Sequence, residues 1–313
     1  MNESRAMIPR RQFLNTLAAT AAASVVACAA RSERFRLRYI LSSAMYGEMP
    51  LEVILPEVAK TGCEAIDIWC RVHGNQREQI TEMGDGPFMA LLQRHGVKLG
   101  VSTRYPLGPM GLQEEMTWMR KLGGGIIVTG SKGPKEPSGA AARAAVKEFL
   151  EQMKPHLTHA EEAGVTIAVE NHDKQLLYHP DSLRYFAELN RSPRLGIAFA
   201  PHHLHAWADQ IPSLIRDLGA AQIPFMYFQE HSEGIRQKAA KEIEMRQMPG
   251  FGGGLDYRPI VRALSDIRYA GYVEIFMHPT PRGIPILPTA AEITAAINRS
   301  RDYVERCRAE VVG

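Results

Sequence analysis

The chain has 313 residues, which is long enough to bury a large core in one barrel or in two smaller domains. Hydrophobic residues make up 45% and charged residues 23% of it, as is usual in soluble globular proteins. The net charge is only +3, and no basic run could follow a phosphate backbone, which argues against a nucleic-acid-binding protein.

Residues 1–35 predict a cleavable export signal rather than part of the fold. The pair Arg10-Arg11 is followed by a small apolar run, Leu17–Ala27, which is too short to span a membrane as a stable helix. The run ends in Val-Val-Ala-Cys at Cys28, which resembles a lipobox; ordinary signal-peptidase cleavage nearby is the alternative. We expect the twin-arginine export machinery as a partner, and a bacterial periplasmic protein or membrane-anchored lipoprotein whose lipid anchor is its only membrane contact.

The three remaining cysteines are expected to be free, buried thiols despite export. Cys63 and Cys70 flank the expected strand Ala65–Trp69, and an extended segment of that length holds their Cα atoms far beyond disulfide range. Twin-arginine substrates cross the membrane already folded, so thiols such as these and Cys307 are compatible with export.

From about residue 36 onward, apolar strands that end in polar residues alternate with amphipathic helices. We expect eight strands, at Arg38–Ser43, Ala65–Trp69, Lys98–Thr103, Gly125–Thr129, Thr166–Asn171, Gly196–Ala200, Pro224–Gln229 and Tyr272–Met277. We expect helices at Leu51–Lys60, Phe88–His95, Leu112–Leu122, Ala140–Ala163, Pro180–Leu189, Ala208–Leu218, Tyr257–Ile267 and Ala290–Ala309.

This alternation predicts a parallel sheet covered by helices, and eight units in about 270 residues fit a single α/β domain, a (β/α)8 TIM barrel. The alternative is a doubly wound sheet, but the glycines at 123–125 precede a strand instead of following one, so no dinucleotide-binding turn is present. Because no linker divides residues 36–313, we expect one domain after the signal segment.

Chemistry is expected at the carboxyl ends of the strands, where TIM barrels place their functional residues. Glu170, Glu230 and Glu274 fall there, after or within strands five, seven and eight. Seven of the eleven histidines follow strands five to eight, namely His172, His179, His202, His203, His205, His231 and His278.

Glu170 and Glu274 each lie within an apolar strand, where a carboxylate is costly unless it is paired or binds a metal. With nearby imidazoles, they would suit a divalent ion such as Mn²⁺, Mg²⁺, Co²⁺ or Zn²⁺. An ion pair with Arg104 or Arg282 is the alternative.

The histidines and Trp69 also allow two interpretations. His172 and His203 either contact the site or donate hydrogen bonds that shape their loops, and we favour the loop role for His202 and His205. Trp69 either stacks on a sugar or simply packs in the core.

Three stretches of the sequence carry a further signal. They are Gly-Val-Thr-Ile-Ala-Val-Glu-Asn-His (164–172), Leu-Gly-Ile-Ala-Phe-Ala-Pro-His-His (195–203), and the segment 253–275 with Gly-Gly-Leu-Asp-Tyr-Arg-Pro-Ile and Gly-Tyr-Val-Glu-Ile. Together they resemble the xylose isomerase-like barrels, a group that includes sugar epimerases, inosose dehydratase-like and hydroxypyruvate isomerase-like proteins, and metal-dependent endonucleases. The resemblance covers most of residues 37–309 and is greatest for exported members described only as sugar phosphate isomerase/epimerase-like.

In epimerases of this group, Glu, Asp, His and Glu from strands five to eight hold one metal ion, and the two glutamates exchange protons with the substrate. Glu170 matches the first position and Glu274 the last, but the expected Asp falls on Ala200, which cannot bind a metal. His203 matches the histidine three residues later. The strand-seven histidine is also missing, and Gln229, Glu230 or His231 could replace it.

The resemblance therefore implies the following site. The catalytic residues are Glu170 and Glu274. The metal ligands are Glu170, His203, Glu230 and Glu274, for a divalent Mn, Mg, Co or Zn ion whose binding Ala200 weakens. The substrate-binding residues are His172, Trp69, Arg104, Arg236 and His278, of which Arg236 resembles the arginine that follows the strand-seven ligand in the epimerases.

The leading hypothesis is an isomerase or epimerase that acts on an unphosphorylated sugar or keto-sugar through carboxylate-mediated proton transfer, with or without a metal. A keto-glycoside lyase that begins with the same proton abstraction, and a non-catalytic carbohydrate-binding barrel, are the alternatives. A repair nuclease is disfavoured, since those relatives need more metal ligands and an exported chain would not meet DNA. The sequence indicates no oligomeric state.

Overall fold

The computed structural model describes residues 35–312. The predicted twin-arginine signal and the lipobox at Cys28 lie outside the described residues. Among those described, no helix has the length and apolar character needed to cross a membrane.

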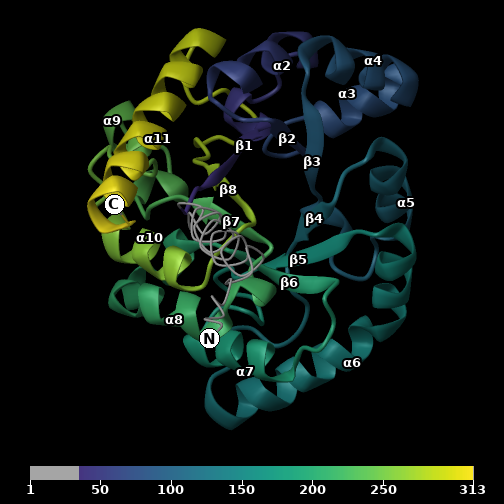
Figure 1. Cartoon of the computed structure of the whole chain (residues 1–313), viewed down its shortest axis with the longest axis vertical. Coiled ribbons are helices and arrows are strands. Elements are labelled where there is room, and N and C mark those ends of the chain that lie inside the picture. The colour runs from purple at the N-terminus through teal and green to yellow at the C-terminus, as the bar shows by residue number, and fades with distance from the viewer. Residues whose placement is uncertain (1–34, 313) are drawn as a thin grey trace, which may run out of the picture. The chain divides into compact units, whose positions relative to one another are not determined.

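Eight parallel strands close into a barrel in the order of the sequence, which confirms the predicted (β/α)8 fold (Figure 1). Each strand pairs with the strands before and after it, and β8 pairs with β1 through Ile40 and Glu274. The strands are β1 (Arg38–Ser42), β2 (Ala65–Trp69), β3 (Lys98–Thr103), β4 (Ile126–Thr129), β5 (Thr166–Glu170), β6 (Leu195–Phe199), β7 (Phe225–Phe228) and β8 (Tyr272–Ile275).

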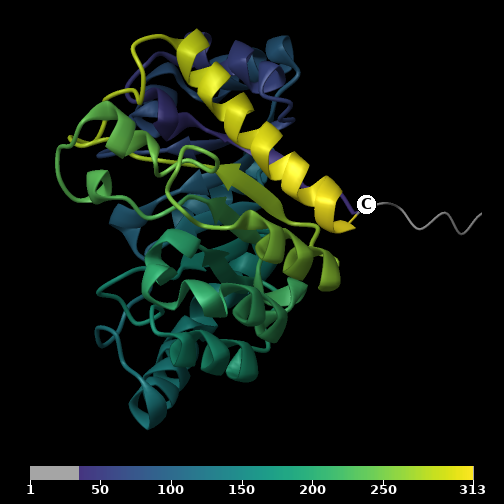
Figure 2. The ribbon, with the colours of Figure 1, turned by 90° about the vertical axis from the view of Figure 1, so that its left-hand side faces the viewer.

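Helices surround this barrel on the outside (Figure 1). The helices are α2 (Leu51–Lys60), α3 (Gln76–Met83), α4 (Asp85–His95), α5 (Gln113–Leu122), α6 (Gly139–Ala163), α7 (Pro180–Leu189), α8 (Ile211–Leu218), α9 (Lys241–Met245), α10 (Tyr257–Asp266) and α11 (Ala290–Val312). Short 3-10 helices are η1 (Ser43–Tyr46), η2 (Tyr105–Leu107), η3 (Pro201–Gln210), η4 (Ala220–Gln222) and η5 (Glu233–Ile235). The closing helix α11 packs against α10 and α2, and Figure 2 shows it crossing the outside of the barrel.

Local signals in the sequence explain where several helices begin and end. Gly96, Gly123 and Gly164 follow α4, α5 and α6 with φ angles of 65°, 78° and 70°, a left-handed conformation that glycine adopts without a steric penalty. At the start of α7, the ring of His179 accepts a hydrogen bond from the backbone of Asp181. These ends fix the loops that lead into the following strands.

Buried side chains lie both on the strands and on the helix faces that cover them, and all five residues of β2 are buried. Two carboxylates, Asp67 and Glu274, are among them, each with 0% of its surface exposed. The described cysteines Cys63, Cys70 and Cys307 are free thiols as predicted, although Cys63 is only half-buried.

Candidate functional site

Two adjoining pockets lie at the carboxyl ends of the strands. The inner pocket has a volume of about 90 Å³ and the outer pocket about 580 Å³. Their linings share four histidines, so we treat them as one site with an inner and an outer part: His172, His202, His203 and His278. A further pocket of about 460 Å³ is lined by Lys98, Gly125 and Tyr272 at the opposite end of the barrel, where TIM barrels do not place their chemistry.

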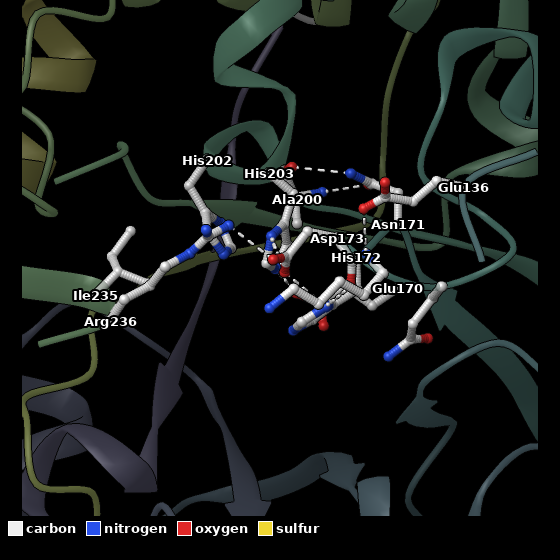
Figure 3. Close-up of polar contacts among 12 residues, drawn as sticks. Glu136, Glu170, Asn171, His172, Asp173, Ala200, His202, His203, Ile235 and Arg236 are labelled. Carbon is white, nitrogen blue, oxygen red and sulfur yellow. Dashed lines mark hydrogen bonds and ion pairs between the residues drawn. The ribbon is translucent and has the colours of Figure 1, made fainter. Parts of the chain in front are cut away.

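The end of β6 is held by an amide side chain from the end of β5 (Figure 3). Asn171 accepts a hydrogen bond of 2.7 Å from the backbone nitrogen of Ala200 and donates one of 2.9 Å to its carbonyl oxygen. The backbone nitrogen of His203 donates to the same carbonyl oxygen at 3.3 Å. Ala200, at the position where the family pattern expects a ligand carboxylate, thus anchors the backbone through its own peptide groups. This anchor fixes the start of η3, the segment that carries His202 and His203.

Glu170 is the carboxylate of the inner pocket. One of its oxygens accepts a hydrogen bond from the hydroxyl of Tyr105, and the other lies 3.8 Å from Nε2 of His203. Glu170, His202 and His203 each offer one ligand atom within 4.8 Å of the others. His202 therefore joins the site, contrary to the loop role that the sequence favoured for it.

The donor set of this group fits a divalent metal ion. One carboxylate and two imidazoles are common ligands of Zn²⁺ and related ions. Burial lowers the pKa of both His202 and His203, which keeps the imidazoles in the neutral form that binds metals. The buried Nδ1 atom of His202 has no hydrogen-bond partner among the described residues, so this ring has an unused nitrogen.

A second group lies at the boundary with the outer pocket and is centred on Asp173 (Figure 3). Its carboxylate lies 3.0 Å from Nδ1 of His172, 3.3 Å from Nδ1 of His203 and 2.7 Å from Nη2 of Arg236. Hydrogen bonds with His172 and His203 hold the pKa of Asp173 well below its usual range. Burial alone would lower the pKa of His172, but its bonds with Asp173 and the charge of Glu170 raise it to about 9.

Glu274 lies outside both pockets, which corrects the predicted arrangement of two facing glutamates. It is fully buried, and Phe276, which lies just past the end of β8 and points to the same side, lines the inner pocket. Phe276 stacks on Trp69 with ring centroids 4.8 Å apart and lies 5.5 Å from the ring of Tyr227. This aromatic floor places Glu274 in the barrel interior.

Beneath the floor, Glu274 interacts with a second buried carboxylate, Asp67. Burial, and then the charge of Asp67, raises the pKa of Glu274 well above its usual value, and burial raises that of Asp67. Asp67 accepts a hydrogen bond of 2.7 Å from the hydroxyl of Thr103. Two interacting carboxylates cannot both ionise readily in a buried site, so the folded protein favours the protonated form of Glu274.

Glu230 and Arg104 also lie away from the pockets, and their predicted site roles need correction. Glu230 has 2% of its surface exposed and accepts a hydrogen bond of 3.0 Å from the backbone of Leu255, in the loop before α10. The side chains of Tyr227 and Gln229 take the inward face of this segment instead. Arg104 forms an ion pair of 3.7 Å with Glu115 of α5.

The other predicted residues do line the site. Trp69 lines the inner pocket, Arg236 the outer pocket, and His172 and His278 both. Sequence reasoning missed Tyr105 and Asp173, although each lies within three residues of a strand end, and it named Arg282 only as an alternative ion-pair partner. Asp173 could have been found, because it directly follows Glu-Asn-His at the end of β5.

A family model described as the xylose isomerase-like TIM barrel matches residues 55–303. The chain belongs to this family. Among solved structures, a xylose isomerase domain protein from Alicyclobacillus acidocaldarius is 15% identical to this xylose isomerase-like barrel, with a TM-score of 0.64, and the match covers 89% of this chain and 100% of that one.

Two further solved structures share the barrel. A D-psicose 3-epimerase from Clostridium cellulolyticum H10, solved with D-tagatose, is 16% identical over 87% of this chain and 99% of its own, with a TM-score of 0.64. An IolI protein with a bound zinc atom is 15% identical over 88% and 98%, with a TM-score of 0.58. No curated protein matches this xylose isomerase-like chain significantly.

Proposed function

We propose that this chain is a carbohydrate isomerase or epimerase that moves a proton at the carbon next to a sugar carbonyl. The observation that carries the proposal is the position of Glu170, which faces the inner pocket with the ligand atoms of His202 and His203 within 4.8 Å. The fold alone does not give a function. The named epimerases among the similar structures therefore support this class only in combination with that carboxylate.

The proton is taken by Glu170 and exchanged through His203. Since the carboxylate of Asp173 can only accept, Nδ1 of His203 carries the hydrogen and Nε2, on the side of Glu170, is free to receive a proton. Tyr105 orients Glu170: burial, and then the charge of Glu170, raises the pKa of its hydroxyl well above the usual value, so it stays a donor. A divalent ion held by Glu170, His202 and His203 would occupy Nε2 of His203 in place of the proton, so Glu170 alone would take and return the proton. The ion would polarise the sugar carbonyl and stabilise the charge that develops on its oxygen.

The test joins metal analysis to proton exchange. The purified full-length chain is analysed for bound metal, and unphosphorylated ketoses and aldoses are incubated with it in deuterated water and examined by NMR. We expect deuterium at the carbon next to the carbonyl, and a loss of at least about a hundredfold in Glu170→Gln, the usual range for a general base. The control is Glu274→Gln, which retains exchange because Glu274 lies beneath the aromatic floor. Absence of exchange on every sugar would overturn the proposal.

Two observations favour a non-catalytic carbohydrate-binding barrel as the second candidate. Ala200 stands where a ligand carboxylate is expected, and Glu274 does not line the inner pocket that Glu170 faces. A bound sugar that exchanges no proton would support this candidate. A keto-glycoside lyase would show exchange together with release of the leaving sugar, which the same NMR spectra detect.

We also propose that the chain is exported by the twin-arginine route. The proposal rests on Arg10-Arg11, the apolar run Leu17–Ala27 and Cys28. An exported enzyme meets free sugars rather than the phosphorylated sugars of the cell interior, which supports an unphosphorylated substrate. Replacement of Arg10 and Arg11 by lysine should retain the precursor inside the cell, as fractionation and immunoblotting would show.

A further inference from the structure

The outer pocket carries an excess of fixed positive charge. Its lining includes three permanent cations, Lys174, Arg236 and Arg282, and one anion, Asp173, which gives the lining residues a net fixed charge of +2. Histidine charges are not counted in this balance. Arg236 is ion-paired with Asp173 at 2.7 Å, so the excess belongs to Lys174, which is exposed, and to Arg282, which is half-buried.

Arg282 is held rigidly and has no carboxylate partner within ion-pair distance among residues 35–312. It follows β8, and its Nη1 atom donates 2.7 Å to the carbonyl of Pro279 and 3.3 Å to that of His278. Its Nη2 atom donates 2.6 Å to the carbonyl of Ile235, in the loop after β7. The groups that these bonds bring into contact with the Arg282 guanidinium are carbonyl oxygens, which carry no net charge.

The carboxylate that acts on Arg282 from a distance does not cancel its charge. Glu244 of α9 is itself ion-paired with Lys241 at 2.6 Å and accepts a hydrogen bond from the backbone of Thr280. A cation that has lost part of its water without gaining a counter-ion is unfavourable. A pocket-lining arginine of this kind has the planar donor geometry that matches carboxylate and phosphate groups.

We infer that the site takes a sugar that carries an anionic group, with the anion bound by Arg282 in the outer pocket and the reacting carbon in the inner pocket beside Glu170. The outer pocket, at about 580 Å³, has the volume of clefts that hold small ligands. This inference rests on the proposed function, which says that the ligand is a sugar, and it adds that the sugar is negatively charged. A sugar carboxylate and a sugar phosphate share the required chemistry.

Calorimetric titration of the full-length chain tests this inference. The probes are D-glucuronate, D-galacturonate and D-mannuronate, each beside its parent hexose, together with glucose 6-phosphate. We expect at least one anionic sugar to bind about tenfold or more tightly than its neutral parent, the factor that corresponds to about 1.4 kcal/mol. Its affinity should fall with added sodium chloride while that of the parent hexose stays constant. The uronates and the phosphate together identify which anion is preferred.

Variants of Arg282 assign the effect to this side chain. Arg282→Gln should remove the preference for the anionic sugar, and Arg282→Lys should retain part of it. The matched control is Arg262→Gln, an exposed arginine of α10 that lines neither pocket and should leave the preference unchanged. Thermal unfolding checks that each variant is folded. If Arg282→Gln does not fold, the salt dependence of anionic-sugar binding by the original chain still tests whether the site binds an anion.

The outcomes separate this inference from the proposed function. Equal binding of anionic and neutral sugars, or a preference that survives in folded Arg282→Gln, would overturn the anion site and leave proton transfer intact. No binding by any probe would also overturn it. Tight binding of an anionic sugar without deuterium exchange would support the anion site and overturn the enzyme.

Discussion

Replacing Glu230 by glutamine should make the barrel more stable at alkaline pH. Burial raises the pKa of Glu230 from 4.5 to about 7. In the unfolded chain the carboxyl loses its proton near its usual pKa, while the folded protein keeps it until about pH 7, so folding takes up a proton in between. The unfolded state therefore gains stability relative to the folded state as the pH rises through this window, and the free energy of unfolding falls.

The magnitude follows from the two pKa values. The difference between 4.5 and about 7 corresponds to about 3 kcal/mol, reached above about pH 7 and absent below about pH 4.5. Glutamine keeps an oxygen that can accept the hydrogen bond from Leu255 but has no proton to lose. The free energy of unfolding of Glu230→Gln, relative to that of the original chain, should therefore rise by up to about 3 kcal/mol between about pH 5 and about pH 8.

Urea unfolding followed by circular dichroism at several pH values measures this gain. The control is Glu242→Gln, an exposed glutamate of α9, whose difference from the original chain should stay nearly constant with pH. If the difference in free energy of unfolding between Glu230→Gln and the original chain does not change with pH, the buried carboxyl of Glu230 is not the cause of the lost stability. Loss of bound metal in Glu230→Gln would instead restore Glu230 as a ligand.

Three other variants test the remaining parts of the argument. Asn171→Ala leaves two buried backbone groups of Ala200 without their side-chain partner and should lower the free energy of unfolding by about 2–5 kcal/mol; a chemical denaturation curve equal to that of the original chain would contradict the anchor. Tyr105→Phe removes the hydrogen bond to Glu170 and should slow deuterium exchange about tenfold while bound metal is retained; an unchanged exchange rate would count against the orienting role. Cys28→Ala should abolish lipid attachment, and an unchanged mass and membrane fraction of the exported protein would show that Cys28 is not lipidated.

The barrel could be predicted from the sequence because each strand is apolar, ends in polar residues and precedes an amphipathic helix. The helices that were missed carry weak signals. In α3 only Gln76 and Ile80 are buried, so the segment lacks an apolar stripe, and α9 is only 5 residues long. Glycine caps marked the ends of the longer helices well, since their positive φ angles require that residue.

The site could be predicted only in part, because the sequence does not show in which direction each side chain points. Glu230 follows Gln229, and a shift of one residue turns a side chain to the other face of a strand. Glu274 shares its face with Phe276, whose ring fills the space above it, and a family pattern carries no information about that filling. The sequence placed Glu170 correctly, at the last residue of β5. At that position no further residue of the strand can cover the side chain and close it off from the pocket.

The two hydrogen bonds between Asn171 and Ala200 join the ends of β5 and β6 into one rigid unit. Glu170 directly precedes Asn171, and His203 follows Ala200 by one turn, so the two ligand-bearing segments cannot separate without breaking both bonds. Folding therefore sets the spacing of the metal-ligating side chains before an ion or a sugar binds. The entropy lost in bringing these side chains together is a cost of folding and does not reduce the binding affinity. Hydrogen exchange at the amide of Ala200 should accordingly be as slow with an empty site as with a filled one.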